Sequence, residues 1–306
     1  MKVGSLDTLA AREALRERVA SATPGSLTRA DFGHEAHLAL AFELVRELGP
    51  REGLAATESL LMRALLAIGA PQRAYHATWT RAWVEVIGLA LAAGPAAEPD
   101  ALFDRLRRHA DAERVARSYR ASTLESDAAR RDWVAPDAGP LDVPWEGPPG
   151  SPALRWATAD DLRAVRRLFE AYQRELGVDL CFQGFPEELA GLPGAYAPPD
   201  GALMVAERGG ALVGCGALRP QPGAGPEVAE IKRLYVCPEA RGGGLGRRMS
   251  LVLMAHARGL GYAQVVLDTL SRLEAACRLY EGLGFRLRPP YVPNPEPDVR
   301  YYTHLV

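Results

Sequence analysis

The sequence predicts an all-helical N-terminal domain followed by an α+β domain, and three observations lead to this. Before residue 135, apolar residues recur with a period near that of a helix, and no stretch alternates as a strand does. Six prolines then fall between residues 135 and 152, a composition that is incompatible with helix or central strand. Beyond residue 153, strand-like and helical runs alternate. The predicted parts are therefore domains 1–134 and 153–306, joined by a proline-rich linker over 135–152.

The first domain is predicted to be a bundle of about five or six helices. Asp31 can cap the start of one helix, and Gly49-Pro50 ends it. The runs beyond residue 100 are shorter and more polar than those before it. The helical runs, in chain order, cover 6–20, 34–48, 53–68, 74–92, 100–109, 112–119 and 122–133.

The second domain is predicted to follow the order β-α-α-β-β-β-α-β-α-β-β. A hairpin at Arg208-Gly209-Gly210 joins its second and third strands. The predicted strands cover 153–157, 202–207, 211–218, 228–236, 263–267, 285–287 and 301–305. The predicted helices cover 158–176, 185–192, a run ending near 260, and 272–283.

Bulk composition limits the classes of function. The chain is 48% hydrophobic and 24% charged, as in globular proteins, and its net charge of −2 gives no general attraction to nucleic acid or to anionic membrane. The four cysteines form no C-x-x-C pair and are expected to be reduced thiols. Residues 1–20 lack the apolar core of a signal peptide, and the apolar run 86–97 is too short to span a bilayer. We therefore expect a cytoplasmic, bacterial protein.

A glycine-rich turn is the most informative stretch of the chain. Arg241-Gly242-Gly243-Gly244-Leu245-Gly246 follows a strand-like run, 231–236, and opens a helical run that includes 251–257. Such a turn leaves backbone N–H groups unpaired at the positive end of a helix dipole, which makes an anion site, usually for phosphate. Glycine allows the close approach and the positive φ angles that such a turn needs.

The order of elements, this turn, and two further segments resemble the GNAT superfamily of acyl-CoA-dependent N-acetyltransferases over about 153–306. One segment is the run from Glu230 to Pro238 that leads into the turn, and the other is Tyr280-x-x-x-Gly284-Phe285 after the last helix. The resemblance implies a mixed β-sheet flanked by helices, acetyl-CoA as the acyl donor, and no metal. The cofactor-binding residues that it implies are Leu234, Tyr235, Val236, Arg241, Gly242, Gly243, Gly244, Leu245, Gly246, Arg247 and Thr269.

The implied reaction is attack of an amine on a thioester, which needs a base for the amine proton and an acid for the leaving thiolate. Tyr280 lies where family members place the acid, and a phenol with a pKa of about 10 keeps its proton at neutral pH. Many relatives have an asparagine seven residues before this tyrosine, where this chain has Leu273. The contact to the pantetheine arm is therefore expected from Thr269 or Ser271.

Glu230 is the candidate base, because it lies eleven residues before Arg241, as the catalytic glutamate does in the histone acetyltransferase branch. It is expected either to act through a water molecule or to pair with Lys232 or an arginine and shape the cleft. Strict alternation along this strand predicts two faces, Glu230, Lys232, Leu234 and Val236 on one and Ile231, Arg233 and Tyr235 on the other.

Acceptor recognition is expected from two variable segments, 177–196 and 289–300. Phe182, Gln183 and Asn294 are the candidate substrate-binding residues. The acceptor is expected to be a primary amine of a small molecule or a peptide. An alternative is a non-catalytic acyl-CoA-binding sensor, with the helical domain as its output or partner-binding module. A homodimer is also left open.

Three histidines stand out in the helical domain. His34 and His37 are three residues apart on one predicted helix, and His76 begins another. They are weak candidates for a metal site or a small-ligand site, and the alternative is that they cap helices or form hydrogen bonds inside the bundle. This region resembles an uncharacterised bacterial helical domain, which implies no function.

Overall fold

The computed structural model describes residues 6–93, 98–108, 110–141 and 151–306. The chain forms two compact units, Met1–Pro144 and Trp145–Val306. Half of the predicted linker, residues 142–150, lies outside the described residues, so the linker assignment stays a prediction. None of the described helices is both long enough and apolar enough to cross a membrane.

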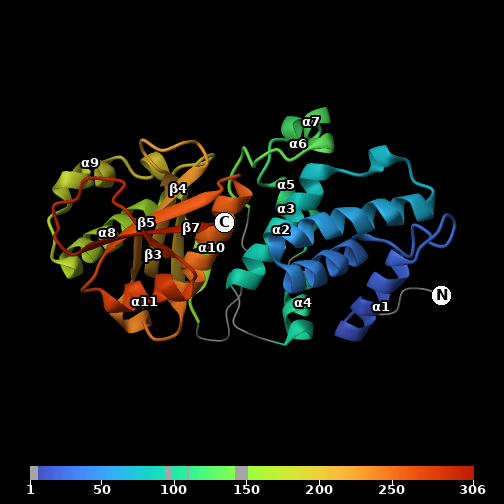
Figure 1. Ribbon diagram of the computed structural model, residues 1–306, viewed down its shortest axis with the longest axis horizontal. Helices are drawn as coiled ribbons and strands as arrows, with labels where there is room; N and C mark the ends of the chain where they lie inside the picture. The colour runs from blue at the N-terminus through green and yellow to red at the C-terminus, as the bar shows by residue number, and fades with distance from the viewer. Residues whose placement is uncertain (1–5, 94–97, 109, 142–150) are drawn as a thin grey trace. The chain divides into compact units, whose positions relative to one another are not determined.

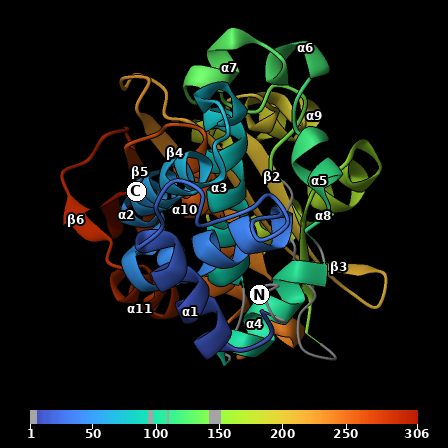
Figure 2. The ribbon, with the colours of Figure 1, turned by 90° about the vertical axis from the view of Figure 1, so that its right-hand side faces the viewer.

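The first unit is helical, as predicted (Figure 1). Its central helix packs against the first and third helices, which lie beside it in both views (Figures 1 and 2). The predicted helix over 122–133 is divided, because Ser126 caps a separate last helix through the N–H of Ala129. The described helices are α1 (Leu9–Ala20), α2 (His34–Ile68), α3 (Ala77–Ala93), α4 (Pro99–Arg108), α5 (Ala112–Ala116), α6 (Ala121–Leu124) and α7 (Asp127–Arg131).

Helix α2 contains a sharp break that matches the predicted end at Gly49-Pro50. Gly49 has a φ of 78° and a ψ of 168°, which no helical residue adopts. The two halves then approach closely, since a Cβ on Gly53 would lie 2.8 Å from the Cα of Val45. The two predicted helices, 34–48 and 53–68, are therefore the two halves of α2.

The second unit is a seven-stranded mixed sheet flanked by helices, which confirms the predicted fold class (Figure 1). Among the described strands the order is β1-β2-β3-β4-β5-β7-β6, and only the β4–β5 pair is parallel. The strands are β1 (Ala153–Trp156), β2 (Ala202–Arg208), β3 (Ala211–Pro220), β4 (Val228–Val236), β5 (Gln264–Leu270), β6 (Arg286–Arg288) and β7 (Val299–Leu305). The helices are α8 (Leu162–Leu176), α9 (Phe185–Ala190), α10 (Leu245–Gly259) and α11 (Glu274–Gly282).

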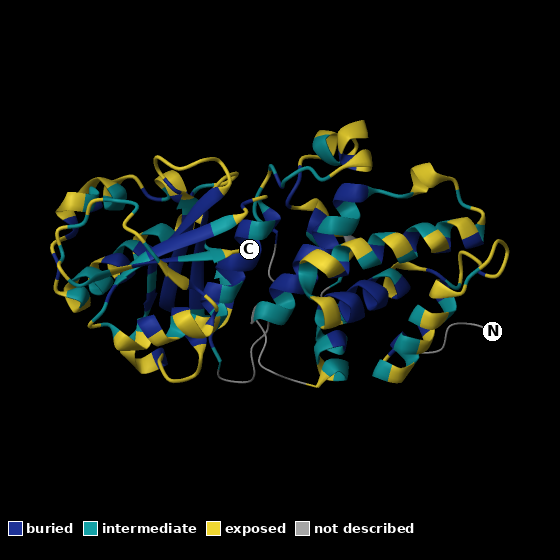
Figure 3. Cartoon of the chain, in the orientation of Figure 1, coloured by how far each residue is buried: buried dark blue, intermediate teal, exposed yellow. Residues whose placement is uncertain are grey.

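Both faces of the sheet are covered, so its central strands are buried (Figure 3). Helix α8 packs on the face that carries Val205 and Cys215, through Phe169 and its neighbours. Helix α10 packs on the other face, where Leu253 approaches Gly216 so closely that a Cβ there would lie 3.1 Å from it. Apolar residues at successive strand positions are thus buried on alternate faces, which explains the nearly continuous apolar runs of β2 and β3.

A β-bulge in β4 corrects the predicted alternation of side chains. Ala217 pairs with Lys232 and Cys215 pairs with Tyr235, so Arg233 and Leu234 together face the single residue Gly216. Arg233 has a positive φ of 55°, as bulged residues sometimes do. The prediction that Leu234 shares a face with Lys232 was wrong, because the extra residue reverses the alternation. Tyr235 instead lies on the face of Lys232, under α8.

Strands β4 and β5 pair over a short stretch only. Their register runs from Val228 opposite Gln264 to Glu230 opposite Val266. Beyond this point β4 continues to Val236 and β5 to Leu270 without pairing with each other. The sheet therefore opens into a wedge between these two strand ends. Backbone groups of the unpaired part of β4 are left on the edge that faces this wedge.

Candidate active site

The glycine turn forms the N-terminus of α10 in the conformation that the sequence predicts. Gly242 and Gly244 have φ angles of 85° and 71°, which residues with a Cβ rarely adopt. Gly244 is the N-cap and supplies no side chain, and the first helical bond runs from the N–H of Arg248 to the Gly244 carbonyl, at 3.1 Å. The N–H groups of the three residues between them therefore point out of the helix and are available to an anion.

Two arginines flank the turn. Nε of Arg241 donates to the Val236 carbonyl at 2.8 Å, and its guanidinium also contacts Glu175 at 2.7 Å. Arg247 donates to the Gly282 carbonyl at 3.3 Å. These contacts hold both side chains beside the turn, and Glu175 compensates part of the charge of Arg241.

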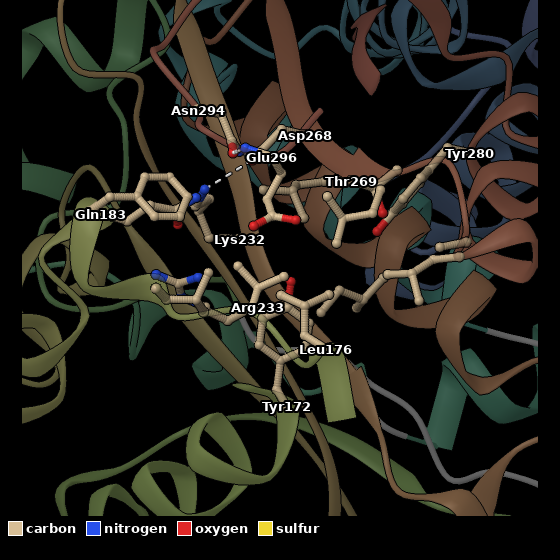
Figure 4. A pocket seen from close by; sticks show the side chains of 18 residues that line it. Tyr172, Leu176, Gln183, Lys232, Arg233, Asp268, Thr269, Tyr280, Asn294 and Glu296 are labelled. Atoms are coloured by element: carbon tan, nitrogen blue, oxygen red, sulfur yellow. Dashed lines mark hydrogen bonds and ion pairs between the residues drawn. The ribbon is translucent and has the colours of Figure 1, made fainter. Parts of the chain in front are cut away.

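Two cavities meet in the wedge. The turn-side cavity encloses about 1,550 Å³ including its open mouth and is lined by the glycine turn, the end of β4 and α11. The wedge cavity encloses about 680 Å³ by the same measure and lies between the ends of β4 and β5 (Figure 4). They share the wall residues Tyr172, Leu176, Leu234, Leu273, Ala276 and Tyr280. The arrangement thus connects an anion site to an inner chamber.

Two tyrosines stand at the junction of these cavities. Tyr280 comes from α11 and Tyr172 from α8, and both line both cavities (Figure 4). The Tyr280 ring packs against Phe285 and Tyr302, and no hydrogen bond to its hydroxyl is found among the described residues. Burial raises the pKa of the Tyr280 phenol, and burial likewise raises the pKa of Tyr172 to about 12. Both groups therefore keep their protons at neutral pH. The sequence did not single out Tyr172, because nothing in the pattern of an amphipathic helix distinguishes it from a core residue.

Asp268 is the central charged group of the wedge cavity. Lys232 donates to its carboxylate at 2.9 Å and Asn294 at 3.2 Å. Burial by itself raises the pKa of Asp268, but the Lys232 ammonium, Arg233 and the Asn294 hydrogen bond outweigh it and lower the pKa below the usual range. Asp268 therefore presents an ionised carboxylate to the cavity. It lies in β5 directly after the apolar residues of that strand, and the sequence analysis did not single it out as a site residue.

Glu230 lies behind Lys232 and is not among the residues that line either cavity. Its side chain is 1% exposed and takes two hydrogen bonds from Arg219, at 2.9 and 2.7 Å. Tyr291 donates to its other oxygen at 2.9 Å, and the Lys232 ammonium lies 3.6 Å away. These contacts match the cleft-shaping alternative that the sequence offered for Glu230.

The bulged Arg233 forms a second buried pair. Its guanidinium donates to both carboxylate oxygens of Glu188 in α9, at 2.9 and 2.6 Å, and lies over the Phe185 ring. This pair fixes the bulge and attaches the segment after α8 to β4. Both cations that line the wedge cavity on β4, Lys232 and Arg233, are therefore neutralised by carboxylates.

The remaining predicted site residues line these cavities, except Gly243, which lines neither. Leu234 lines both, and Tyr235 and Val236 line the turn-side cavity. Phe182, Gln183, Asn294 and Thr269 line the wedge cavity, although Thr269 was predicted as a contact to the donor. The Gln183 side-chain oxygen is buried and has no hydrogen-bond partner among the described atoms. Polar capacity in this cavity is thus left for a ligand.

The three histidines of the helical unit do not form one cluster. His34 and His37 line a common cavity between α2 and α3, whereas His76 lines a different one. His76 caps α3 instead, since its Nδ1 accepts from the N–H of Trp79 at 3.2 Å while its Nε2 contacts the Leu124 carbonyl at 2.9 Å. Within the described ranges, no three His, Cys, Asp or Glu residues are grouped as metal ligands.

The second unit is similar in sequence to known acetyltransferases. The acetyltransferase (GNAT) family matches residues 162–285, all of them in the second unit. An uncharacterized N-acetyltransferase of Schizosaccharomyces pombe is 42% identical over 142 residues, 46% of this chain and 86% of that protein. An IAA acetyltransferase of Azospirillum brasilense is 37% identical over 135 residues, 44% of this chain and 85% of that protein. A protein of Salmonella typhimurium, solved with its cofactor acetyl-CoA, aligns with a TM-score of 0.38 and 22% identity over 51% of this chain and 94% of that chain.

The chain belongs to the GNAT family of acetyltransferases, through its second unit. Members of this family are acyltransferases that use acetyl-CoA to acetylate amines. The resemblance stated from the sequence is thereby confirmed.

Proposed function

We propose that this protein transfers the acetyl group of acetyl-CoA to the primary amine of a small molecule by direct attack. The observation that carries the proposal is the pair of connected cavities in the β4–β5 wedge. One begins at the anion-binding turn, the other contains an ionised carboxylate, and two protonated tyrosines stand between them. Such an arrangement keeps donor and acceptor on opposite sides of the reacting centre.

The turn-side cavity fits the donor. The unpaired N–H groups at the start of α10, with Arg241 and Arg247, suit a pyrophosphate. The unpaired edge of β4, over Leu234, Tyr235 and Val236, suits an extended arm that carries amide groups. Bound there, acetyl-CoA supplies an activated acetyl thioester. Leu273 contributes an apolar wall where relatives have an asparagine.

Tyr280 is the proposed acid. Its hydroxyl is free of other hydrogen bonds within the described part of the chain, and its raised pKa keeps the proton in place until a developing thiolate takes it. Tyr172, on the other side of the junction, is the alternative candidate for the acid because it also lines both cavities.

Asp268 is the proposed contact for the acceptor amine. Its low pKa suits a carboxylate that binds an ammonium group and orients the water that takes the proton, rather than a strong base. Glu230 is then a positioning residue: it holds Lys232, which in turn holds Asp268. In this proposal Asp268 contacts the acceptor amine, the role that the sequence analysis considered for Glu230.

The walls of the wedge cavity favour an amine attached to an apolar group. Val178, Leu180 and Phe182 give apolar surface, while Asp268 and the unpartnered Gln183 oxygen accept hydrogen bonds. The lysine and the arginine that line it are already paired with carboxylates. A carboxylate on the acceptor, in addition to its amine, would therefore be buried without a counter-ion, at a substantial cost in binding free energy.

The test is an acceptor panel with the purified full chain and acetyl-CoA, read by thiol release and by the mass of the acetylated product. The panel is 2-phenylethylamine, phenylalanine, ethanolamine and a tripeptide with a free N-terminus. We expect 2-phenylethylamine to have the highest kcat/KM and phenylalanine to be at least about tenfold lower, because its carboxylate finds no partner. Coenzyme A binding without amine-dependent thiol release would overturn the proposal and favour the acyl-CoA sensor.

A further inference from the structure

The loop 289–298, between β6 and β7, contributes to the wedge cavity but is anchored by a residue of the turn-side cavity. Asn294 and Glu296 line the wedge cavity. Arg272, in the turn between β5 and α11, lines the turn-side cavity instead. Its guanidinium donates to the Asp298 carboxylate at 2.5 Å, and another of its nitrogens lies 3.6 Å from a carboxylate oxygen of Glu296. One arginine thus connects the walls of both cavities.

Backbone contacts fasten the same end of the loop. The N–H of Arg272 donates to the second carboxylate oxygen of Asp298 at 3.3 Å. The N–H of Ser271 donates to the Asp298 carbonyl at 2.7 Å. A carboxylate that accepts from a guanidinium and from a backbone N–H together is held in one place more firmly than one in an isolated exposed ion pair.

At the inner end of the loop, Asn294 meets Asp268. The side-chain oxygen of Asn294 accepts from the N–H of Glu296 at 3.1 Å, and its nitrogen donates to Asp268 at 3.2 Å. These three side chains lie together at one edge of the wedge cavity (Figure 4). Contacts therefore run from Arg272 through the loop to the carboxylate that is proposed to meet the acceptor amine.

Prolines make this connection stiff. The segment between the two anchored ends reads Pro293-Asn294-Pro295-Glu296-Pro297-Asp298, and it forms neither helix nor strand. Each proline fixes its own φ and restricts the residue before it, so proline-rich segments behave as semi-rigid spacers. A displacement of Asp298 is therefore passed on to Asn294 instead of being absorbed within the loop.

We propose that Arg272 is a positioning residue for the amine acceptor, although its side chain lines the cavity assigned to the donor. It holds Asp298 and Glu296, the stiff segment carries this constraint to Asn294, and Asn294 orients Asp268. The inference rests on the proposed function for the role of Asp268 toward the amine. The competing role for Arg272 is a direct contact to the phosphates of the donor, which its place in the turn-side cavity also allows.

The kinetic test is Arg272→Gln in the full chain, with acetyl-CoA and the best amine of the acceptor panel. We expect the KM for the amine to rise about three- to tenfold, between the effect of an exposed ion pair and that of a hydrogen bond to a charged group. The KM for acetyl-CoA should stay within about twofold. Arg272→Lys keeps the charge and should recover part of the loss. An unchanged amine KM, or an acetyl-CoA KM that rises at least as much, would overturn the inference.

Two further variants test the route. Arg278→Gln is the matched control, because Arg278 lies on α11, pairs with Glu274 at 3.0 Å and lines neither cavity, so it should change neither KM. Asn294→Ala removes the contact to Asp268. Adding Arg272→Gln to it should raise the amine KM by less than about twofold more, because residues that act through one contact are not additive. Multiplied effects of the two changes would contradict the route.

Amide hydrogen exchange tests the positioning without catalysis. In Arg272→Gln the loop 289–298 should exchange at least about threefold faster than in the wild-type protein, whereas Arg278→Gln should leave it unchanged. Unchanged exchange of the loop in Arg272→Gln would overturn the inference whatever the activity. A wild-type protein that releases no thiol with any amine would instead refute the proposed function, and the exchange measurement would still decide whether Arg272 holds the loop.

Discussion

Substitution of Tyr280 by phenylalanine is the sharpest test of the proposed chemistry. The ring would keep its contacts with Phe285 and Tyr302, whose centroids lie 5.8 and 6.1 Å away. The lost hydroxyl has no hydrogen bond to a described residue, so the free energy of unfolding should change by less than about 0.5 kcal/mol. Loss of a general acid costs roughly 100-fold or more in kcat, which corresponds to about 2.7 kcal/mol in the barrier.

The assay is thiol release at saturating acetyl-CoA and amine, together with thermal unfolding. We expect kcat to fall by roughly 100-fold while the KM for acetyl-CoA and the Tm stay nearly unchanged. Tyr172→Phe is the matched control, because Tyr172 lines the same two cavities and its pKa is also raised by burial. If Tyr172→Phe loses the activity and Tyr280→Phe keeps it within about threefold, the roles are reversed and the reasoning from the family position fails.

Three further predictions concern the donor site and the charged network. Gly244→Ala should raise the KM for acetyl-CoA at least about tenfold. Gly223→Ala is the control, because Gly223 has a similar positive φ in an exposed loop; it should lower stability through the same backbone strain and leave the KM unchanged. Asp268→Asn should lower kcat/KM for amines and lower the Tm at pH 7. Because the pKa of Asp268 is depressed in the folded protein, the carboxylate stabilises the fold above about pH 4, and this stabilisation is lost as the pH falls through the native pKa. The Tm difference between the wild-type protein and the variant should therefore shrink at such low pH. Glu230→Gln should destabilise the fold by about 3 kcal/mol, because it breaks the buried ion pair with Arg219. It should leave the shape of the pH–rate profile unchanged, and loss of a titration step from that profile would restore Glu230 as the base.

Much of the fold followed from local patterns. The helical period, the break at Gly49-Pro50 and the glycine turn act over a few residues, and the structure reproduces them. The element order, the glycine turn and the segments around Glu230 and Tyr280 together indicated the family that the comparisons confirm. The charged network did not follow in the same way, because Asp268, Lys232 and Asn294 are distant in sequence and meet only when β4, β5 and the loop before β7 are folded together.

The β-bulge shows the same limit at a finer scale. Alternation along β4 assigns faces correctly up to Lys232, but one extra residue opposite Gly216 reverses the assignment beyond it. No local signal identifies this position, since Arg233 is held at a positive φ by its pair with Glu188 from another element. Without the bulge, Tyr235 and Leu234 would exchange faces.

The sequence by itself determined the glycine turn and its anion-binding geometry, because such a turn is a local structure that needs only glycines between a strand and a helix. Only the tertiary structure decided which groups line the wedge cavity. It placed Glu230 behind Lys232, brought Asp268 and Tyr172 into the wedge, and separated His76 from His34 and His37. The physical reason is that a backbone turn is specified by neighbouring residues, whereas a cavity is specified by side chains that meet through packing and ion pairs across several elements.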